Sequence, residues 1–187
     1  MHKKVATIIL NRNLPKITDL LFNKLKKNNK KISDFFILEA GSLRSNLSKN
    51  FTWHANWKSA KKNGLRFARG MNYALSSLLE EEKFNSYDAF FLLTNDTELE
   101  EKSNISTLLN ILDKNPTIGI LSPCGSTWGE RLLLKESTLK FFWYVHNSAY
   151  FLRKEFIESI CNQENPDRMN FLFDGNNFRG YHTETEL

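Results

Sequence analysis

The chain has 187 residues and a formal net charge of +5; 41% of its residues are apolar and 25% are charged, as in a water-soluble globular domain. Only 8 glycines and 4 prolines occur, and neither a low-complexity tract nor an internal repeat is present, which argues against disordered and solenoid architectures. No apolar run approaches the roughly 20 residues that span a bilayer, and Cys124 and Cys161 lack metal-binding spacing, so we expect a reduced, cytoplasmic protein.

The N-terminus reads MHKKVATIILNRN, a basic start followed by a short apolar run. Residues 5–10 are rich in β-branched side chains and predict a strand that is covered on both faces. The run breaks at residues 11–13, and no small-residue cleavage site follows. The segment is therefore a first strand and not a signal peptide.

A helix is expected next, because Ile17, Leu20, Leu21 and Leu25 recur at helical spacing and Pro15 suits a first turn. Lysines cluster at its end, where the helix dipole favours cations, and a solvated helix end explains them. The alternatives are peripheral contact with an anionic inner membrane face and contact with nucleic acid, because a basic patch by itself indicates only that anions are attracted. Of these the membrane contact is retained, and no nucleic-acid partner is predicted. The lysines are Lys24, Lys26, Lys27, Lys30 and Lys31.

Strands and helices alternate through the middle of the chain. Apolar runs predict strands at 35–38, 89–93 and 118–121, and apolar stripes at helical spacing predict helices at 67–79 and 105–112. Such alternation indicates an α/β fold with a largely parallel central sheet and helices on both faces.

The pattern changes in the last third. Aromatic-rich segments at 141–145 and 149–152 are separated by only three residues, and a short helix is expected at 154–161. This part is predicted to add antiparallel strands beside the sheet. No linker interrupts the chain, so residues 1–187 are expected to form a single domain.

Three predicted strands end in polar segments: Asn11-Arg12-Asn13, residues 39–42 (EAGS) and residues 94–97 (TNDT). In open α/β sheets, ligands bind beyond the C-terminal ends of the parallel strands. A polar turn or a helix cap would explain each segment taken alone. Three such segments at one edge of the sheet indicate a binding site. Asp96 could supply an oxygen ligand to a hard cation that carries phosphates. Neither a P-loop nor a glycine-rich dinucleotide fingerprint is present.

The segments VATIILNRN, FFILEAGS, NGLRFARGMNYAL, YDAFFLLTNDTEL, IGILSPCG and FDGNNFRGYHTETEL together resemble the family 2 glycosyltransferases of the GT-A fold, in particular the rhamnosyltransferase-like branch. The resemblance implies a three-layer sandwich, with a nucleotide-sugar-binding half at 1–123 and an acceptor-side half at 124–187. Members usually continue further, so the chain is either a minimal domain or truncated at its C-terminus.

The resemblance also assigns residues on the donor side. Asp96 matches the last acid of the family's DxD-like motif and would coordinate Mg²⁺ or Mn²⁺ bridging the donor diphosphate. Glu39 stands where an Asp is usual, which leaves the preferred nucleobase open. The donor-binding residues implied are Leu10, Asn11, Arg12, Glu39, Gly41, Arg69, Asn72, Thr94 and Asn95.

On the acceptor side, TETEL matches the family's catalytic-base segment, with Thr183 in place of the first acid and Glu184 at the base position. A helix start with Glu186 in a capping box explains the same residues. Trp143, His146 and Glu186 are assigned to the acceptor pocket, with core packing as the alternative for the aromatic side chains.

The function expected is a metal-dependent, inverting transfer of a sugar from a nucleoside diphosphate donor to a hydroxyl of a glycan or lipid-linked acceptor. The alternatives are a non-catalytic nucleotide- or glycan-binding relative and a nucleotidyltransferase-like enzyme. The latter usually has a glycine- and lysine-rich N-terminal signature, which VATIILNRNLPK lacks.

Overall fold

The computed structural model describes residues 4–99, 104–125, 139–141, 145, 148–161 and 167–176. Its strands are β1 (Val5–Asn11), β2 (Ser33–Glu39), β3 (Trp53–His54), β4 (Ala89–Thr94), β5 (Ile120–Leu121) and β6 (Ala149–Arg153). Its helices are α1 (Pro15–Asn29), α2 (Lys58–Asn63), α3 (Phe67–Glu80), α4 (Asn104–Lys114) and α5 (Lys154–Ile160), with 3₁₀ turns η1 (Arg44–Asn46) and η2 (Phe84–Ser86).

The described strands form one sheet in the order β3-β2-β1-β4-β6-β5. The first four strands of that order are parallel, whereas β6 is antiparallel to both β4 and β5. The expected α/β class, with a mostly parallel sheet and added antiparallel strands, is confirmed. Because β1, β2 and β4 are neighbours and parallel, their C-terminal ends lie at the same edge of the sheet.

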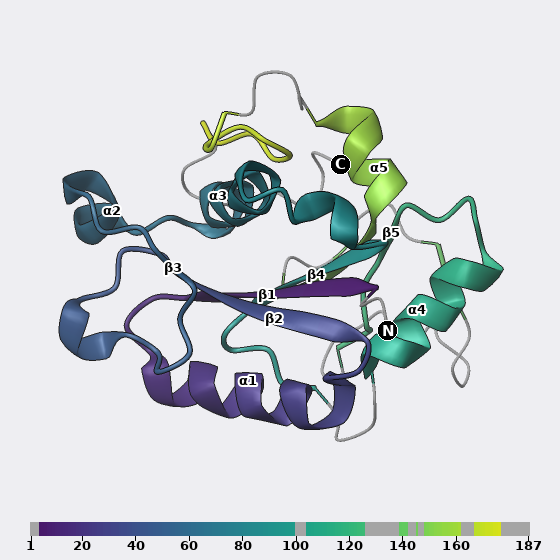
Figure 1. The fold of residues 1–187 in the computed structure, drawn as a ribbon, viewed down its shortest axis with the longest axis horizontal. Coiled ribbons are helices and arrows are strands. Elements are labelled where there is room, and N and C mark those ends of the chain that lie inside the picture. Colours follow the sequence, from purple (N-terminus) through teal and green to yellow (C-terminus); the bar gives the residue numbers. More distant parts are fainter. Residues whose placement is uncertain are drawn as a thin grey trace.

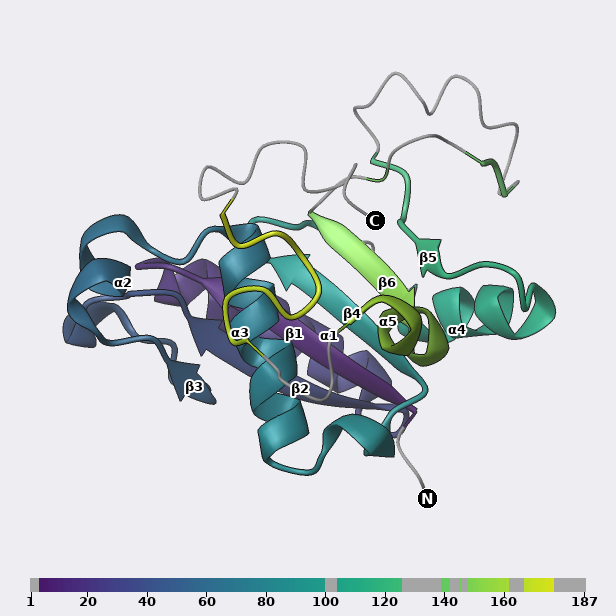
Figure 2. The ribbon, with the colours of Figure 1, turned by 90° about the horizontal axis from the view of Figure 1, so that it is seen from above.

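Helices cover both faces of the sheet (Figure 1), with α1 and α4 on one side and α3 and α5 on the other. Figure 2 shows α3 and α5 lying across the strands. The strand β4 contains the uninterrupted apolar run Phe90-Phe91-Leu92-Leu93, because both of its faces are covered. Phe90 and Leu92 pack in the cluster under α3, while Phe91 and Leu93 pack in the cluster under α1 and α4. All four are fully buried, and each stabilises the fold by about 1.5–3 kcal/mol.

The C-terminal part departs from the expectation in one strand. The strand expected at 118–121 is shorter, since β5 comprises only Ile120 and Leu121. Arg153 instead donates to the carbonyls of the two residues before β5. Its backbone amide donates to Gly119 O at 2.9 Å, and its Nε donates to Ile118 O at 3.0 Å. The strand expected at 149–152 and the following helix are present as β6 and α5. The one expected at 141–145 lies mostly outside the described residues.

Candidate functional site

The three polar strand ends meet at one edge of the sheet, as the sequence predicts. In the parallel ladders Asn11 is opposite Glu39, and Leu10 is opposite Thr94. The ends of β2, β1 and β4 are therefore adjacent in that order, and the loops that follow them surround a common region.

A buried carboxylate organises this edge. Glu39 is fully buried, and its two carboxylate oxygens accept hydrogen bonds from Asn11 Nδ2 at 3.0 and 2.9 Å. The hydroxyl of Ser42 and the backbone amide of Ser48, at 2.7 Å, donate to the same carboxylate. These donors satisfy an acidic group that burial would otherwise penalise. In this structure the Glu39 carboxylate is thus turned inward and ties the loop after β2 to the end of β1.

Asn11 extends the network to β4. Its side chain is fully buried, and its Oδ1 accepts from Asn95 Nδ2 at 2.9 Å and from the Leu14 amide at 3.2 Å. Asn95 Nδ2 also lies 3.3 Å from Thr18 Oγ1 on α1. The chain of contacts Asn95–Asn11–Glu39 crosses the ends of three strands. We call it the strand-end network.

Asp96 stands beside this network on a turn fixed from the other side. The amide of Thr97 bonds the Thr94 carbonyl at 3.2 Å, and Thr97 Oγ1 bonds the Ser148 carbonyl at 2.7 Å. The Thr94 amide bonds that same carbonyl at 3.1 Å. Asp96 itself is exposed, and no described residue forms a hydrogen bond or ion pair with its carboxylate. The turn therefore presents a free oxygen ligand to solvent.

This arrangement fits a divalent cation held largely by a ligand's phosphates. No group of three or more His, Cys, Asp and Glu side chains that could hold a metal occurs among the described residues. Mg²⁺ sites of the substrate-bridging kind need only one or two protein carboxylates, because phosphate oxygens and water complete the coordination. One exposed Asp96 meets that requirement.

Arg12 joins the site to α2. Its Nη1 and Nη2 donate to the carbonyls of Asn63 and Lys62 at 3.1 and 3.2 Å, and its Nε is buried without a hydrogen-bond partner in the described structure. A Cβ at Gly64 would lie 2.8 Å from three atoms of this side chain. Arg12 thus caps the C-terminal end of α2, where a cation is favoured.

Gly41 allows a second close approach at this edge. Its φ is +90°, and a Cβ there would lie only 2.0 Å from the Ala60 carbonyl oxygen. The turn after β2 therefore requires glycine, because any side chain at this position would clash with the backbone of α2. Together, Gly41 and Arg12 hold α2 over the ends of β1 and β2.

Arg69 and Asn72 lie on α3 and hold the C-terminal segment 167–176. Asn72 Nδ2 donates to the carbonyls of Met169 and Phe173, and its Oδ1 accepts from the amides of Leu172 and Phe173 at 2.9 and 2.8 Å. Arg69 Nε donates to the Gly175 carbonyl. Both side chains are engaged with that segment, and Leu10 packs beside them against Gly70.

The sequence did not point to Ser48 or Thr18 as site residues, whereas Asn13 belongs to the polar segment that was expected at the end of the first strand. Thr18 lies at helical spacing from Leu21 and Leu25 on the buried face of α1, and this spacing is visible in the sequence. Nothing in the sequence marks Ser48. Asn13 adopts a positive φ of 60°, its amide bonds Ser42 Oγ at 3.0 Å, and its Oδ1 accepts from the Leu43 amide. The predicted residues Trp143, His146, Glu184 and Glu186 lie outside the described part of the chain.

Known proteins were compared with the chain by sequence and by structure. No protein-family model matches it, and no curated protein matches its sequence. A mannosyltransferase from Pyrobaculum calidifontis, solved in complex with GDP-Man and Mn²⁺, superimposes with a TM-score of 0.60 at 12% identity. The match covers 90% of this chain and 51% of that one, so this chain spans about half of the mannosyltransferase. The chain has a GT-A-like fold.

A cytidylyltransferase from Leptospira borgpetersenii also matches, with a TM-score of 0.46 at 16% identity. That match covers 86% of this chain and 66% of the other. The mannosyltransferase match shows the fold alone because its identity is low, and the activity has to be argued from the residues at the site.

Proposed function

We propose that the chain binds a nucleoside diphosphate sugar at the C-terminal edge of β1, β2 and β4 and transfers the sugar to a hydroxyl acceptor with inversion. The observation that carries this proposal is the strand-end network beside the exposed carboxylate of Asp96. The GT-A-like fold supports it, because the mannosyltransferase of this fold was solved with a nucleotide sugar and Mn²⁺.

Each residue of the edge has a proposed role. Asp96 holds the Mg²⁺ or Mn²⁺ ion, which when bound neutralises charge on the leaving diphosphate. Asn95 and Thr94 lie against the donor at the end of β4, and Leu10 and Arg12 lie on the nucleoside side. Asn11, Glu39 and Gly41 belong to the same donor site and hold its strand ends and the loop after β2 in place. Arg69 and Asn72 are also proposed for the donor site, and they hold the segment 167–176.

The acceptor side rests on the family resemblance. Glu184 is the proposed base, because a sugar hydroxyl is a weak nucleophile that needs a positioned carboxylate to accept its proton. Trp143, His146 and Glu186 are proposed to contact the acceptor. Membership of family 2 and of its rhamnosyltransferase-like branch is part of the same proposal.

A lipid-linked acceptor would bring the chain to an anionic membrane face, and the outer surface of α1 supports that contact. Ile17 and Leu20 are 48% and 71% exposed, and Lys16 and Lys27 are exposed on the same helix. Exposed apolar side chains beside lysines suit the membrane interface, where the lysines meet anionic headgroups. Within the described residues, no helix has both the length and the apolarity to cross a bilayer.

The decisive experiment is calorimetric titration with UDP, dTDP, GDP and CDP, each with Mn²⁺ and with a chelator. We expect one nucleotide to bind, and only with the metal. Asp96→Asn should weaken that binding by roughly tenfold or more because the carboxylate ligand is lost. Glu98→Gln, which changes the neighbouring exposed carboxylate, should leave affinity unchanged.

Equal affinity with and without Mn²⁺, or equal losses in both variants, would contradict the metal assignment. Product analysis separates the enzyme classes. A glycosyltransferase releases the nucleoside diphosphate from a nucleotide sugar when the acceptor oxygen takes the sugar. Release of pyrophosphate from a nucleoside triphosphate would instead assign a nucleotidyltransferase.

A further inference from the structure

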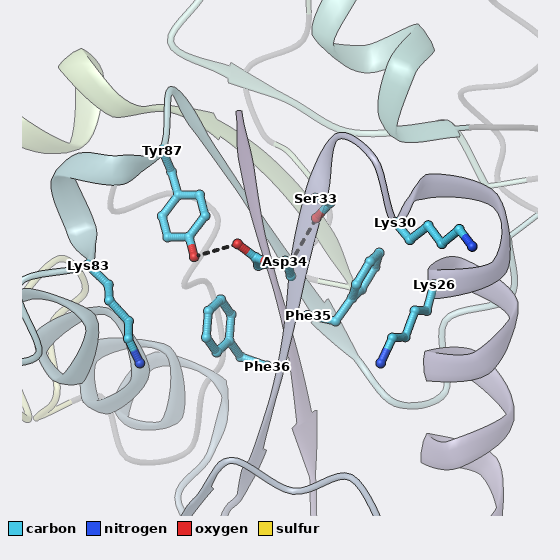
Figure 3. Close-up of a pocket in the computed structure, with 8 residues that line it drawn as sticks. All are labelled: Lys26, Lys30, Ser33, Asp34, Phe35, Phe36, Lys83 and Tyr87. Atoms are coloured by element: carbon cyan, nitrogen blue, oxygen red, sulfur yellow. Dashed lines mark hydrogen bonds between the residues drawn. The ribbon is translucent and has the colours of Figure 1, made fainter. Parts of the chain in front are cut away.

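A pocket of about 350 Å³ lies at the N-terminal end of β2, at the opposite end of the strand from the candidate donor site (Figure 3). Ser33, Asp34, Phe35 and Phe36 of β2 contribute to its lining. The proposed glycosyl transfer makes no use of this region, so its role is a separate question.

Among the residues that the structure describes, none pairs with the outer edge of β2 here. β3 pairs with β2 only at Leu38 and Glu39. Just before them, the Ile37 carbonyl accepts from the Thr52 amide at 2.8 Å, and the Ile37 amide donates to Thr52 Oγ1 at 3.2 Å. Successive residues of a strand direct their backbone groups to opposite sides, so the amide and carbonyl of Phe35 point outward like those of Ile37. No described strand pairs with them.

The two sides of this edge differ in charge. On the α1 side, Phe35 packs edge-on to Phe22 at 6.0 Å, and Lys26 and Lys30 line the pocket. Lys26 Nζ lies 5.0 Å from the centre of the Phe22 ring. Figure 3 shows both lysines on the same side of β2 as Phe35. Neither lysine has a carboxylate partner among the described residues, so this side is positively charged.

The other side is mainly apolar, and its charges are already paired. The ring centres of Phe36 and Tyr87 lie 6.2 Å apart, and the Tyr87 hydroxyl donates to the Asp34 carboxylate at 3.1 Å. Lys83 forms an ion pair with Glu81 at 2.7 Å. Figure 3 shows Tyr87, Phe36 and Lys83 together on this side. An acidic side chain would meet two carboxylates here, whereas an apolar one would meet the rings.

We propose that the groove binds an extended peptide as an added strand beside β2, with acidic side chains at alternate positions and apolar ones between them. Side chains of a strand alternate between its faces. The acidic residues would therefore face Lys26 and Lys30, and the apolar ones would face Phe36 and Tyr87. The backbone of Phe35 supplies the hydrogen bonds, as in other strand-addition complexes. A second copy of this chain fits poorly, because edge-to-edge pairing would bring the lysines of both copies together.

The test uses a capped peptide of alternating Glu and Val, followed by fluorescence anisotropy, and a control peptide of the same composition with the Glu and Val residues in separate blocks. We expect the alternating peptide alone to bind. The double variant Lys26→Glu/Lys30→Glu should weaken binding by roughly tenfold, through loss of two ion pairs and added repulsion. The matched variant Lys27→Glu/Lys31→Glu changes net charge equally, lies outside the pocket lining and should bind normally.

Hydrogen exchange supplies an independent readout of strand addition. Peptide binding should slow exchange of the Phe35 amide, which faces outward, and leave that of Phe36, which faces β1, unchanged. Absence of binding, equal binding of both peptides, or equal losses in both double variants would overturn the proposal. Anionic vesicles provide the last arm: if Lys26→Glu/Lys30→Glu abolishes vesicle binding and the peptide does not bind, these lysines belong to a membrane contact.

Discussion

At the residue scale, Glu39 shows how a buried charge is held by neutral donors. Its carboxylate receives hydrogen bonds from the Asn11 amide, the Ser42 hydroxyl and the Ser48 backbone amide. Hydrogen bonds to ionised groups are stronger than those between neutral groups. Asn11 is oriented as a consequence, with its Oδ1 directed at Asn95. The position of the residue next to Asp96 therefore depends on a carboxylate two strands away.

We predict that Glu39→Ala lowers the free energy of unfolding by about 3–5 kcal/mol, because it leaves several buried donors without an acceptor. Urea denaturation measures the change. The exposed Glu98→Gln is the control and should change stability by less than about 0.5 kcal/mol. A loss for Glu39→Ala below about 1 kcal/mol would show that the carboxylate does not hold this edge together.

At the scale of elements, a segment without regular structure, 167–176, is anchored to α3, and Asn72 makes most of the hydrogen bonds to its backbone. Asn72 of α3 uses its side chain in four hydrogen bonds to the backbone of 169–173, and the side chains of Phe171 and Phe173 in this segment are buried. The Asn72 side-chain amide donates to and accepts from the backbone of this segment, as a neighbouring strand would. Buried backbone groups of such a segment need partners, and Asn72 provides them.

We predict that Asn72→Ala destabilises the protein by about 2–4 kcal/mol, because four hydrogen bonds to partly buried backbone groups are lost. Limited proteolysis should then cut first within 167–176. Ser76→Ala is the matched control, since Ser76 is also buried on α3 but bonds only the Tyr73 carbonyl of its own helix. Equal protease sensitivity of the two variants would contradict the anchoring role.

At the scale of the whole molecule, the two ends of β2 carry different surfaces. The C-terminal end joins the strand-end network beside Asp96, and the N-terminal end forms the open edge flanked by Lys26 and Lys30. A ligand at one end does not contact the other. Donor binding and peptide binding are therefore expected to be separable by mutation.

The proposed reaction is likewise divided between two parts of the chain. The donor residues lie within 1–123, while the proposed base, Glu184, lies in 124–187. We predict that Glu184→Gln leaves the calorimetric affinity for the nucleotide unchanged and lowers turnover by about a hundredfold or more, the contribution of a general base. Turnover equal to that of the unaltered chain would place the base elsewhere.

Periodicity predicted much of this architecture. The runs at 5–10, 35–38 and 89–93 became the parallel core strands, and the stripe at 67–79 became α3. The convergence of three polar strand ends also followed from sequence, because adjacent parallel strands end at one edge. The short β3 and α2 carried no comparable apolar pattern and were not predicted, since two residues of strand and six of helix are too few for periodicity to appear.

The sequence by itself determined the α/β class, the order of the main elements and the position of Asp96 just after a strand, because these follow from local side-chain patterns. Only the tertiary structure decided that Glu39 turns inward to Asn11, that Asn72 holds backbone 97 to 101 residues away, and that β2 keeps an open edge. Those features depend on which segments become neighbours in space. Which groups form hydrogen bonds, and which strand edges stay unpaired, depends on the segments that lie side by side in the fold. Local side-chain patterns in a single sequence do not specify that arrangement.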